Sequence, residues 1–165
     1  MYIIFYPSIS VDICDGVVSG TSGYIVTPNY PNNYPIDLSC RQVLRSAPGT
    51  RITISFPDFN LESSNNCVGD VIAFRDGSGP IATSLGKYCG STVPAQVKSS
   101  GNVIFMEFVS DYSQVSRGFR IYWQSEQAIA ATTTASTTTI SSTEQPTKAP
   151  TKIPEGFPTG RVFYS

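Results

Sequence analysis

The chain has 165 residues, of which 40% are hydrophobic and 12% aromatic, enough for one ordinary domain with a core and a tail. Its formal net charge is −1, from 11 basic and 12 acidic residues, which leaves no basic field for nucleic acid and no polybasic membrane patch. The lack of histidine excludes serine–histidine and cysteine–histidine catalysis within this chain and removes the usual nitrogen ligand of zinc.

Residues 1–13 read as an N-terminal extension. The opening stretch is apolar, but it has no basic segment and is interrupted by Pro7, so it is a poor signal peptide. We expect it to be a truncated start or the beginning of a fragment. No stretch of the chain is long enough and apolar enough to predict a membrane span.

Apolar residues that alternate with polar ones predict four half-buried strands, with turn signals such as Ala47-Pro-Gly49 between them. The strands and their inward residues are 51–56 with Ile52, Ile54 and Phe56; 71–75 with Ile72 and Phe74; 103–109 with Ile104, Met106 and Phe108; and 118–123 with Phe119, Ile121 and Trp123. No amphipathic helix of three turns is evident. The pattern indicates an all-β sandwich or jelly-roll-like domain.

Four cysteines, Cys14, Cys40, Cys67 and Cys89, form no C-x-x-C pair, which argues against zinc and thioredoxin-like sites. Their even number and wide spacing suit two disulfides in an oxidising compartment, with three pairings open. Four buried free thiols in a cytosolic protein are the alternative.

From about Ala128 the chain becomes rich in Thr, Ser, Ala and Pro, and we expect residues 126–165 to be a disordered linker. Tracts of this composition are typical of O-glycosylated, mucin-like stalks. An unmodified disordered tail is the alternative.

Three acidic residues form the candidate site. Glu62 and Asp70 lie on either side of Cys67, and Asp111 follows the apolar run 103–109. Oxygen-only ligand sets suit hard cations, above all calcium. Each acid alone could equally be a solvated loop charge or a turn cap.

Several motifs, in order, resemble the CUB domain family over residues 14–125. They are Gly23-Tyr-Ile-Val-Thr-Pro-Asn-Tyr-Pro-Asn-Asn-Tyr-Pro35, Ala47-Pro-Gly49, Cys67-Val-Gly-Asp70, Tyr88-Cys-Gly90 and Phe108-Val-Ser-Asp111 followed by Gly118-Phe119. The resemblance implies a two-sheet antiparallel jelly-roll-like β-sandwich. It also implies that Cys14 pairs with Cys40 and Cys67 with Cys89.

Many CUB domains carry a calcium site, and the resemblance assigns its parts by position. The three carboxylates are Glu62, Asp70 and Asp111, and Ser113 would add a main-chain carbonyl oxygen. Tyr34 matches a tyrosine whose hydroxyl hydrogen-bonds and orients the glutamate. Gln114 stands where calcium-binding members of the family usually have an asparagine ligand. Its side chain is one methylene longer, which puts its role as a ligand in doubt.

Gln42 is a second departure, because a tryptophan is common two residues after the second cysteine. We expect this change to alter packing more than function.

These features predict a secreted or extracellular calcium-dependent protein-recognition module with no catalytic residues. Glu62 and Asp111 would accept a lysine or arginine of a partner protein, with Tyr112 as an apolar contact. The alternatives are a non-catalytic accessory domain of a larger secreted protease, with its other domains as neighbours, and a matrix component that binds carbohydrate through exposed tyrosines.

Overall fold

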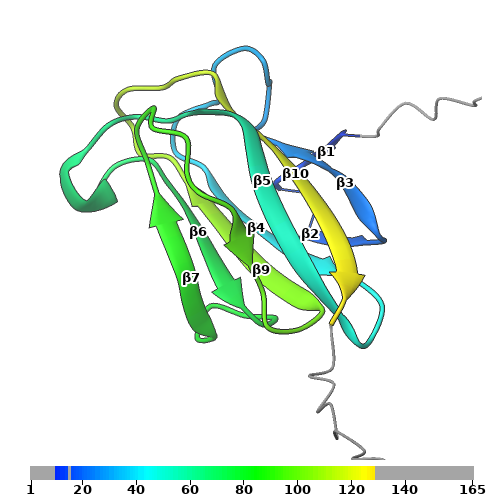
Figure 1. Ribbon diagram of the computed structural model, residues 1–165. Coiled ribbons are helices and arrows are strands. Elements are labelled where there is room, and N and C mark those ends of the chain that lie inside the picture. Colours follow the sequence, from blue (N-terminus) through cyan, green and yellow to red (C-terminus); the bar gives the residue numbers. More distant parts are fainter. Residues whose placement is uncertain (1–9, 15, 129–165) are drawn as a thin grey trace, which may run out of the picture. The chain divides into compact units, whose positions relative to one another are not determined.

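The computed structural model describes residues 10–14 and 16–128. Its strands form two five-stranded sheets that pack as a β-sandwich, as Figure 1 shows. Among the described residues the only helical segment is the 3-10 turn Asn65–Cys67. No helix in this part of the chain is long and apolar enough to cross a bilayer. The all-β sandwich predicted from the sequence is confirmed.

The first sheet has the order β1-β3-β10-β5-β8. Its strands are β1 (Ser10–Asp12), β3 (Ser22–Val26), β10 (Gly118–Gln127), β5 (Thr50–Asn60) and β8 (Val97–Lys98). Every pair is antiparallel except β1 with β3.

The second sheet has the order β2-β4-β9-β6-β7. Its strands are β2 (Gly16–Ser19), β4 (Ser39–Arg45), β9 (Val103–Val109), β6 (Val71–Asp76) and β7 (Thr83–Tyr88). Here too, the edge pair β2 with β4 is parallel and the others are antiparallel.

Both sheets are mainly antiparallel, as the resemblance implied, apart from these two parallel edge pairs. The parallel pairs arise because β1 and β2 each lie beside a strand to which no hairpin connects them. β1 also begins within the residues 1–13 that were expected to be an extension, and Ile13 is fully buried. Residues 1–9, and all of the expected tail beyond Ala128, lie outside the described residues.

The core lies between the sheets and includes every inward residue that alternation predicted. These residues come from β5, β6, β9 and β10. Nine are fully buried: Ile52, Ile54, Ile72, Phe74, Ile104, Met106, Phe108, Phe119 and Ile121. Trp123 and Phe56 are 1% and 7% exposed. Their aromatic rings meet edge to face, for example Phe108 with Phe119 at 5.5 Å between centroids.

Both disulfides have the pairing that the family resemblance implied. Cys14–Cys40 ties the connection between β1 and β2 to β4, and Cys67–Cys89 ties the segment after β5 to the end of β7.

Three connections, residues 27–38, 61–70 and 110–117, gather at one end of the sandwich, the upper end in Figure 1. Backbone bonds join two of them: Asp37 N donates to Asp111 O at 2.8 Å, and Tyr34 N donates to Ser116 O at 3.1 Å. The buried Ser110 hydroxyl adds a bond to Pro35 O at 2.8 Å. This end therefore holds the predicted site residues on connections that are bonded to one another.

Candidate metal centre

Glu62, Asp70 and Asp111 converge at the loop end of the sandwich. One carboxylate oxygen of each residue lies within 4.8 Å of those of the other two. Glu62 follows β5, Asp70 immediately precedes β6, and Asp111 follows β9. Three segments that are distant in sequence thus bring their carboxylates together.

Asp70 is the innermost of the three and is fully buried. One of its oxygens accepts a short hydrogen bond from the Tyr34 hydroxyl. The other accepts a bond from the backbone N–H of Asp111 at 2.8 Å. The Asp70 carboxylate therefore links the 27–38 and 110–117 connections.

Tyr34 is 1% exposed and packs edge-on against Phe108, with 5.3 Å between ring centroids. Its hydroxyl also accepts a bond from the backbone N–H of Glu62 at 3.1 Å. The resemblance predicted that this hydroxyl orients the glutamate. In the structure the hydroxyl contacts the backbone of Glu62 and donates to the side chain of Asp70.

Glu62 is held by contacts along its own loop. Its Oε2 accepts from Asp70 N at 3.3 Å, and its backbone O accepts from Gly90 N at 2.8 Å. Gly69 is packed so closely against this carboxylate that a Cβ at position 69 would overlap Oε2. The Cys67–Cys89 bridge closes the same region, so the direction of Glu62 depends on a glycine and a disulfide.

Asp111 is held by Ser113. The Ser113 backbone N–H and hydroxyl donate to Asp111 Oδ1 at 2.7 and 2.6 Å. The same hydroxyl lies 3.4 Å from Glu62 Oε1. Ser113 thus contacts the trio through its N–H and its hydroxyl. The resemblance assigns it a different role, as the donor of a main-chain carbonyl oxygen to the ion, and that role stays a prediction.

The electrostatics of the trio favour a bound cation. Among the described residues, no lysine or arginine lies within ion-pair distance of these three carboxylates. Burial raises the pKa of Asp70, and the charges of Glu62 and Asp111 raise it further, against the hydrogen bonds from Tyr34 and Asp111 N. The bonds from Ser113 hold the pKa of Asp111 below its usual value. Such an oxygen-only cluster fits the ligand preference of calcium.

Two further predicted residues lie on the surface beside the trio. Tyr112 is 86% exposed. Gln114 is also exposed, and in the described part of the chain no hydrogen bond joins it to the trio. The side chain of Gln114 is thus the one member of the predicted ligand set that lacks a bond to the cluster.

Gln42 lies far from this site in the core. It is fully buried, and its Nε2 donates to Asp12 O at 3.0 Å, whereas its Oε1 has no partner in the described part of the chain. It therefore joins the N-terminal segment to β4, which agrees with a role in packing.

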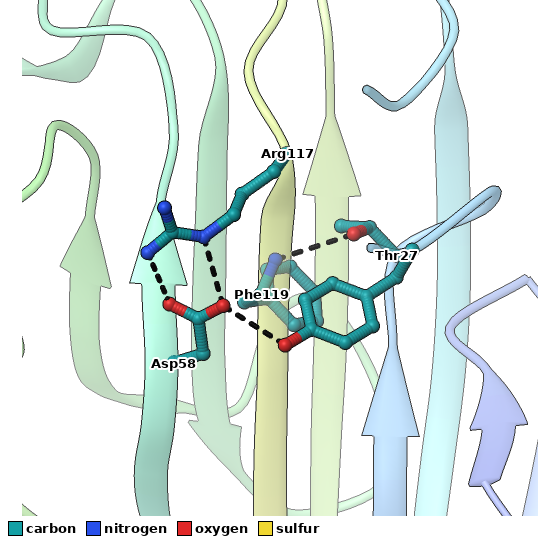
Figure 2. A network of polar contacts seen from close by, with 5 residues as sticks. Thr27, Asp58, Arg117 and Phe119 are labelled. Carbon is teal, nitrogen blue, oxygen red and sulfur yellow. Dashed lines mark hydrogen bonds and ion pairs between the residues drawn. The ribbon is translucent and has the colours of Figure 1, made fainter. Parts of the chain in front are cut away.

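Sequence reasoning missed a second polar network near this end. Figure 2 shows the Arg117 guanidinium facing the Asp58 carboxylate. Its Nε donates to Asp58 Oδ2 at 2.8 Å, and its Nη2 donates to Asp58 Oδ1 at 2.5 Å. The Tyr30 hydroxyl donates to the same carboxylate at 2.9 Å. These bonds lower the pKa of Asp58, chiefly through Arg117. Nothing in the sequence signals the pairing, because 59 positions separate the two residues.

The same figure shows Thr27, whose hydroxyl accepts from Phe119 N at 3.2 Å. Gly118 has φ +85°, and a Cβ there would overlap the Thr27 side chain. The Gly118-Phe119 pair noted in the sequence is thereby explained by close packing at the start of β10.

Comparison with known proteins places the chain in a family. The CUB domain model matches residues 14–123. Human cubilin is 34% identical over 125 residues, which are 76% of this chain and 4% of cubilin. The full extracellular region of zebrafish Gpr126/Adgrg6 superposes with a TM-score of 0.63 at 31% identity, over 70% of this chain and 15% of that one.

A third relative, the MASP-1 CUB2 domain bound to Ca²⁺, gives a TM-score of 0.60 at 27% identity. That likeness covers 67% of this chain and 97% of the other. The chain spans only a small fraction of the length of the curated relatives that it matches. With its sandwich, its two disulfides and the family match over most of the described residues, the chain belongs to the CUB domain family.

Proposed function

We propose that this domain is a calcium-dependent protein-recognition module. The observation that carries the proposal is the convergence of Glu62, Asp70 and Asp111 within 4.8 Å with no basic partner among the described residues. Three carboxylates this close repel one another strongly, and a divalent cation removes that cost. The similar MASP-1 CUB2 domain, which is bound to Ca²⁺, supports the choice of ion.

Under this proposal the ion is held by the three carboxylates, with Ser113 contributing its main-chain carbonyl oxygen. Gln114 would complete the set or leave its place to water. Extracellular calcium modules have dissociation constants of about 10⁻⁴–10⁻³ M. At millimolar calcium such a site stabilises the fold by only about 0.4–1.4 kcal/mol. The ion's main effect is then to order the loops that form the binding surface.

The partner would present a lysine or arginine side chain. Glu62 and Asp111 are only partly buried, unlike Asp70, so their oxygens can accept hydrogen bonds from an incoming cation. Tyr112, 86% exposed beside Asp111, offers an apolar contact to the stem of that side chain.

The wider setting follows from the relatives. Two disulfides and a likeness to an extracellular region support a secreted or extracellular location. We propose that the module is non-catalytic and belongs to a larger parent chain, and that the Thr/Ser-rich residues 126–165 act as a stalk. An accessory domain of a secreted protease and a matrix component remain the alternatives for that parent chain.

Calcium titration of the full chain, followed by amide shifts in NMR spectra, tests the proposal. Asp111→Ala should abolish binding, because it removes a ligand, while the spectrum keeps its folded dispersion. Tyr112→Ala is the matched control: it changes the adjacent residue and should leave the calcium affinity unchanged. Equal affinity of wild type and Asp111→Ala would sink the assignment.

A further inference from the structure

The outer face of the second sheet carries a group of basic residues that the calcium site does not use. On β4, Arg41 and Arg45 alternate with the buried residues Gln42 and Leu44. On β6, Arg75 follows the buried Phe74, and Lys87 lies opposite Ala73 on β7. These four cations therefore project from the same side of the sheet, and we call it the basic face.

Among the described residues that point outward from the second sheet, one is acidic. Glu107 lies directly across from Arg41 and accepts from its Nε at 2.8 Å. Arg45 and Lys87 are exposed, and neither forms an ion pair within the described part of the chain. Arg75 is half-buried: its Nη1 donates to Ala82 O at 3.4 Å, and its Nε is buried without a hydrogen-bond partner in the described part of the chain.

The rest of the domain distributes its charges differently. On the outer side of the first sheet, Arg51 is in register with Glu126, and Arg117 is bonded to Asp58. The loop end carries the three carboxylates of the metal centre. The outer side of the first sheet also carries the exposed Lys98, together with Arg120, whose guanidinium lies 3.9 Å from the ring centroid of Tyr24. Cations therefore exceed carboxylates on both outer sides, and the excess is larger on the basic face, although the whole chain has a net charge of −1.

Three of the four cations, Arg45, Arg75 and Lys87, lie along a diagonal across the sheet. Register places Arg75 opposite Phe105 and Arg45 opposite Val103, on strands that flank β9. From usual strand spacing and rise, the Cα atoms of Arg75 and Lys87 are about 8 Å apart, and those of Arg45 and Arg75 about 12 Å apart. Such a row suits an extended polyanion that crosses the strands.

We propose that the basic face binds a sulfated polysaccharide of the extracellular matrix. Arginine and lysine give charge-assisted hydrogen bonds to sulfate and carboxylate groups. Of the large apolar residues on this face, Val17 is the one that is mostly exposed, at 62%. Protein interfaces depend on buried aromatic or apolar anchors and membrane binding on inserted ones, so a carbohydrate polyanion fits this face better than either.

The test measures binding of a heparin oligosaccharide to the full chain at low salt. The Arg45→Gln/Lys87→Gln double variant should bind about tenfold more weakly or worse, because two charge-assisted contacts are lost. The control, Arg51→Gln/Lys98→Gln, removes two exposed cations from the outer side of the first sheet and should change the affinity by less than about twofold. Near-ultraviolet circular dichroism checks that both variants are folded.

Three further arms separate this surface from the metal centre and from other polyanions. Binding should persist in EDTA, weaken as salt is added, and be lost with desulfated heparin. No binding by the wild type, equal weakening in both double variants, or loss of binding in EDTA would each overturn the proposal. It would also be overturned if a polyglutamate peptide or phosphatidylserine vesicles bound as tightly as the oligosaccharide.

Discussion

Tyr34 is the side chain on which the geometry of the metal centre depends most. Its hydroxyl donates to the buried carboxylate of Asp70 and accepts from the backbone of Glu62. Two of the three carboxylate-bearing segments are thus positioned by one buried phenol. Burial and the neighbouring Asp70 raise the pKa of Tyr34, so the hydroxyl stays protonated and keeps donating at neutral pH.

Tyr34→Phe should weaken calcium binding by roughly tenfold, because partners that orient ligands typically contribute that much to metal affinity. It should also lower the free energy of unfolding by about 1–3 kcal/mol, since Asp70 and Glu62 N lose a buried bond. Tyr30→Phe is the control, because its hydroxyl bonds to Asp58 and not to the trio. Calcium titration and urea denaturation measure both effects; equal calcium affinity in the two variants would contradict this role of Tyr34.

At this scale the sequence predicted which residues meet but not how they bond. The family's order of motifs assigned Glu62, Asp70, Asp111 and Tyr34 to one site, and the three carboxylates do converge. The donor role of Asp111 N toward Asp70 depends on how two distant loops approach. The need for Gly69 depends on its contact with Glu62, which no local pattern reveals.

Among the elements, the connection 110–117 depends on a contact outside the metal centre. Arg117 is the last residue of this connection. Its guanidinium donates two hydrogen bonds to Asp58, near the C-terminal end of β5. Near the other end of the 110–117 connection, Asp111 O accepts a hydrogen bond from Asp37 N, which belongs to the 27–38 connection. The segment that carries Asp111, Tyr112 and Ser113 is therefore fastened at both ends.

Asp58→Asn should make the free energy of unfolding less dependent on pH in the acid range. The pKa of Asp58 is lowered in the folded state, so its contribution is complete above the unfolded-state value of about 3.9 and is lost as pH falls through the lower folded value. The variant should be less stable than wild type by up to about 1 kcal/mol near neutral pH, because the pair is partly exposed. The difference should shrink as pH falls below the unfolded-state value and vanish once the pH is below the folded-state value.

Urea denaturation at several pH values measures this dependence. The Arg117→Gln variant and the double variant complete a cycle that separates the pair from the Tyr30 contact. A stability difference between Asp58→Asn and wild type that stays constant from neutral to acid pH would rule out the ion pair as its source.

The strands that could be predicted are those whose inward positions are all apolar. β5, β6, β9 and β10 show this alternation, and their predicted inward residues are buried. β4 does not show it, because the fully buried Gln42 occupies an inward position. β7 is obscured by Gly86 and a register shift opposite Phe74 and Arg75, and β1 and β8 are too short to show any period.

At the scale of the whole domain, the sandwich separates two surfaces of opposite charge. The carboxylates of the trio lie at the loop end, and the cations of the basic face lie on the outer side of the second sheet. Because the fold keeps them on different parts of the surface, each can be altered without the other. This is why EDTA and the Arg45→Gln/Lys87→Gln variant are expected to affect different ligands.

The disulfides, and not the ion, should dominate the stability of the domain. They join residues 26 and 22 positions apart, so each should contribute roughly 3–4 kcal/mol in the chain-entropy treatment. Together they amount to a large part of the 5–15 kcal/mol typical of a domain, whereas calcium at about millimolar concentration adds about 0.4–1.4 kcal/mol. Thermal unfolding with and without EDTA, and with and without a reductant, compares the two contributions.

EDTA alone should lower the melting temperature by only a few degrees, about what the calcium linkage allows. Reduction should lower it much further or unfold the domain, and EDTA should add little once the cysteines are reduced, because a loosened 61–70 connection no longer positions Glu62 and Asp70. Unfolding by EDTA while both bridges are intact would instead make the ion a structural requirement, and the metal centre would then be part of what holds the two sheets together.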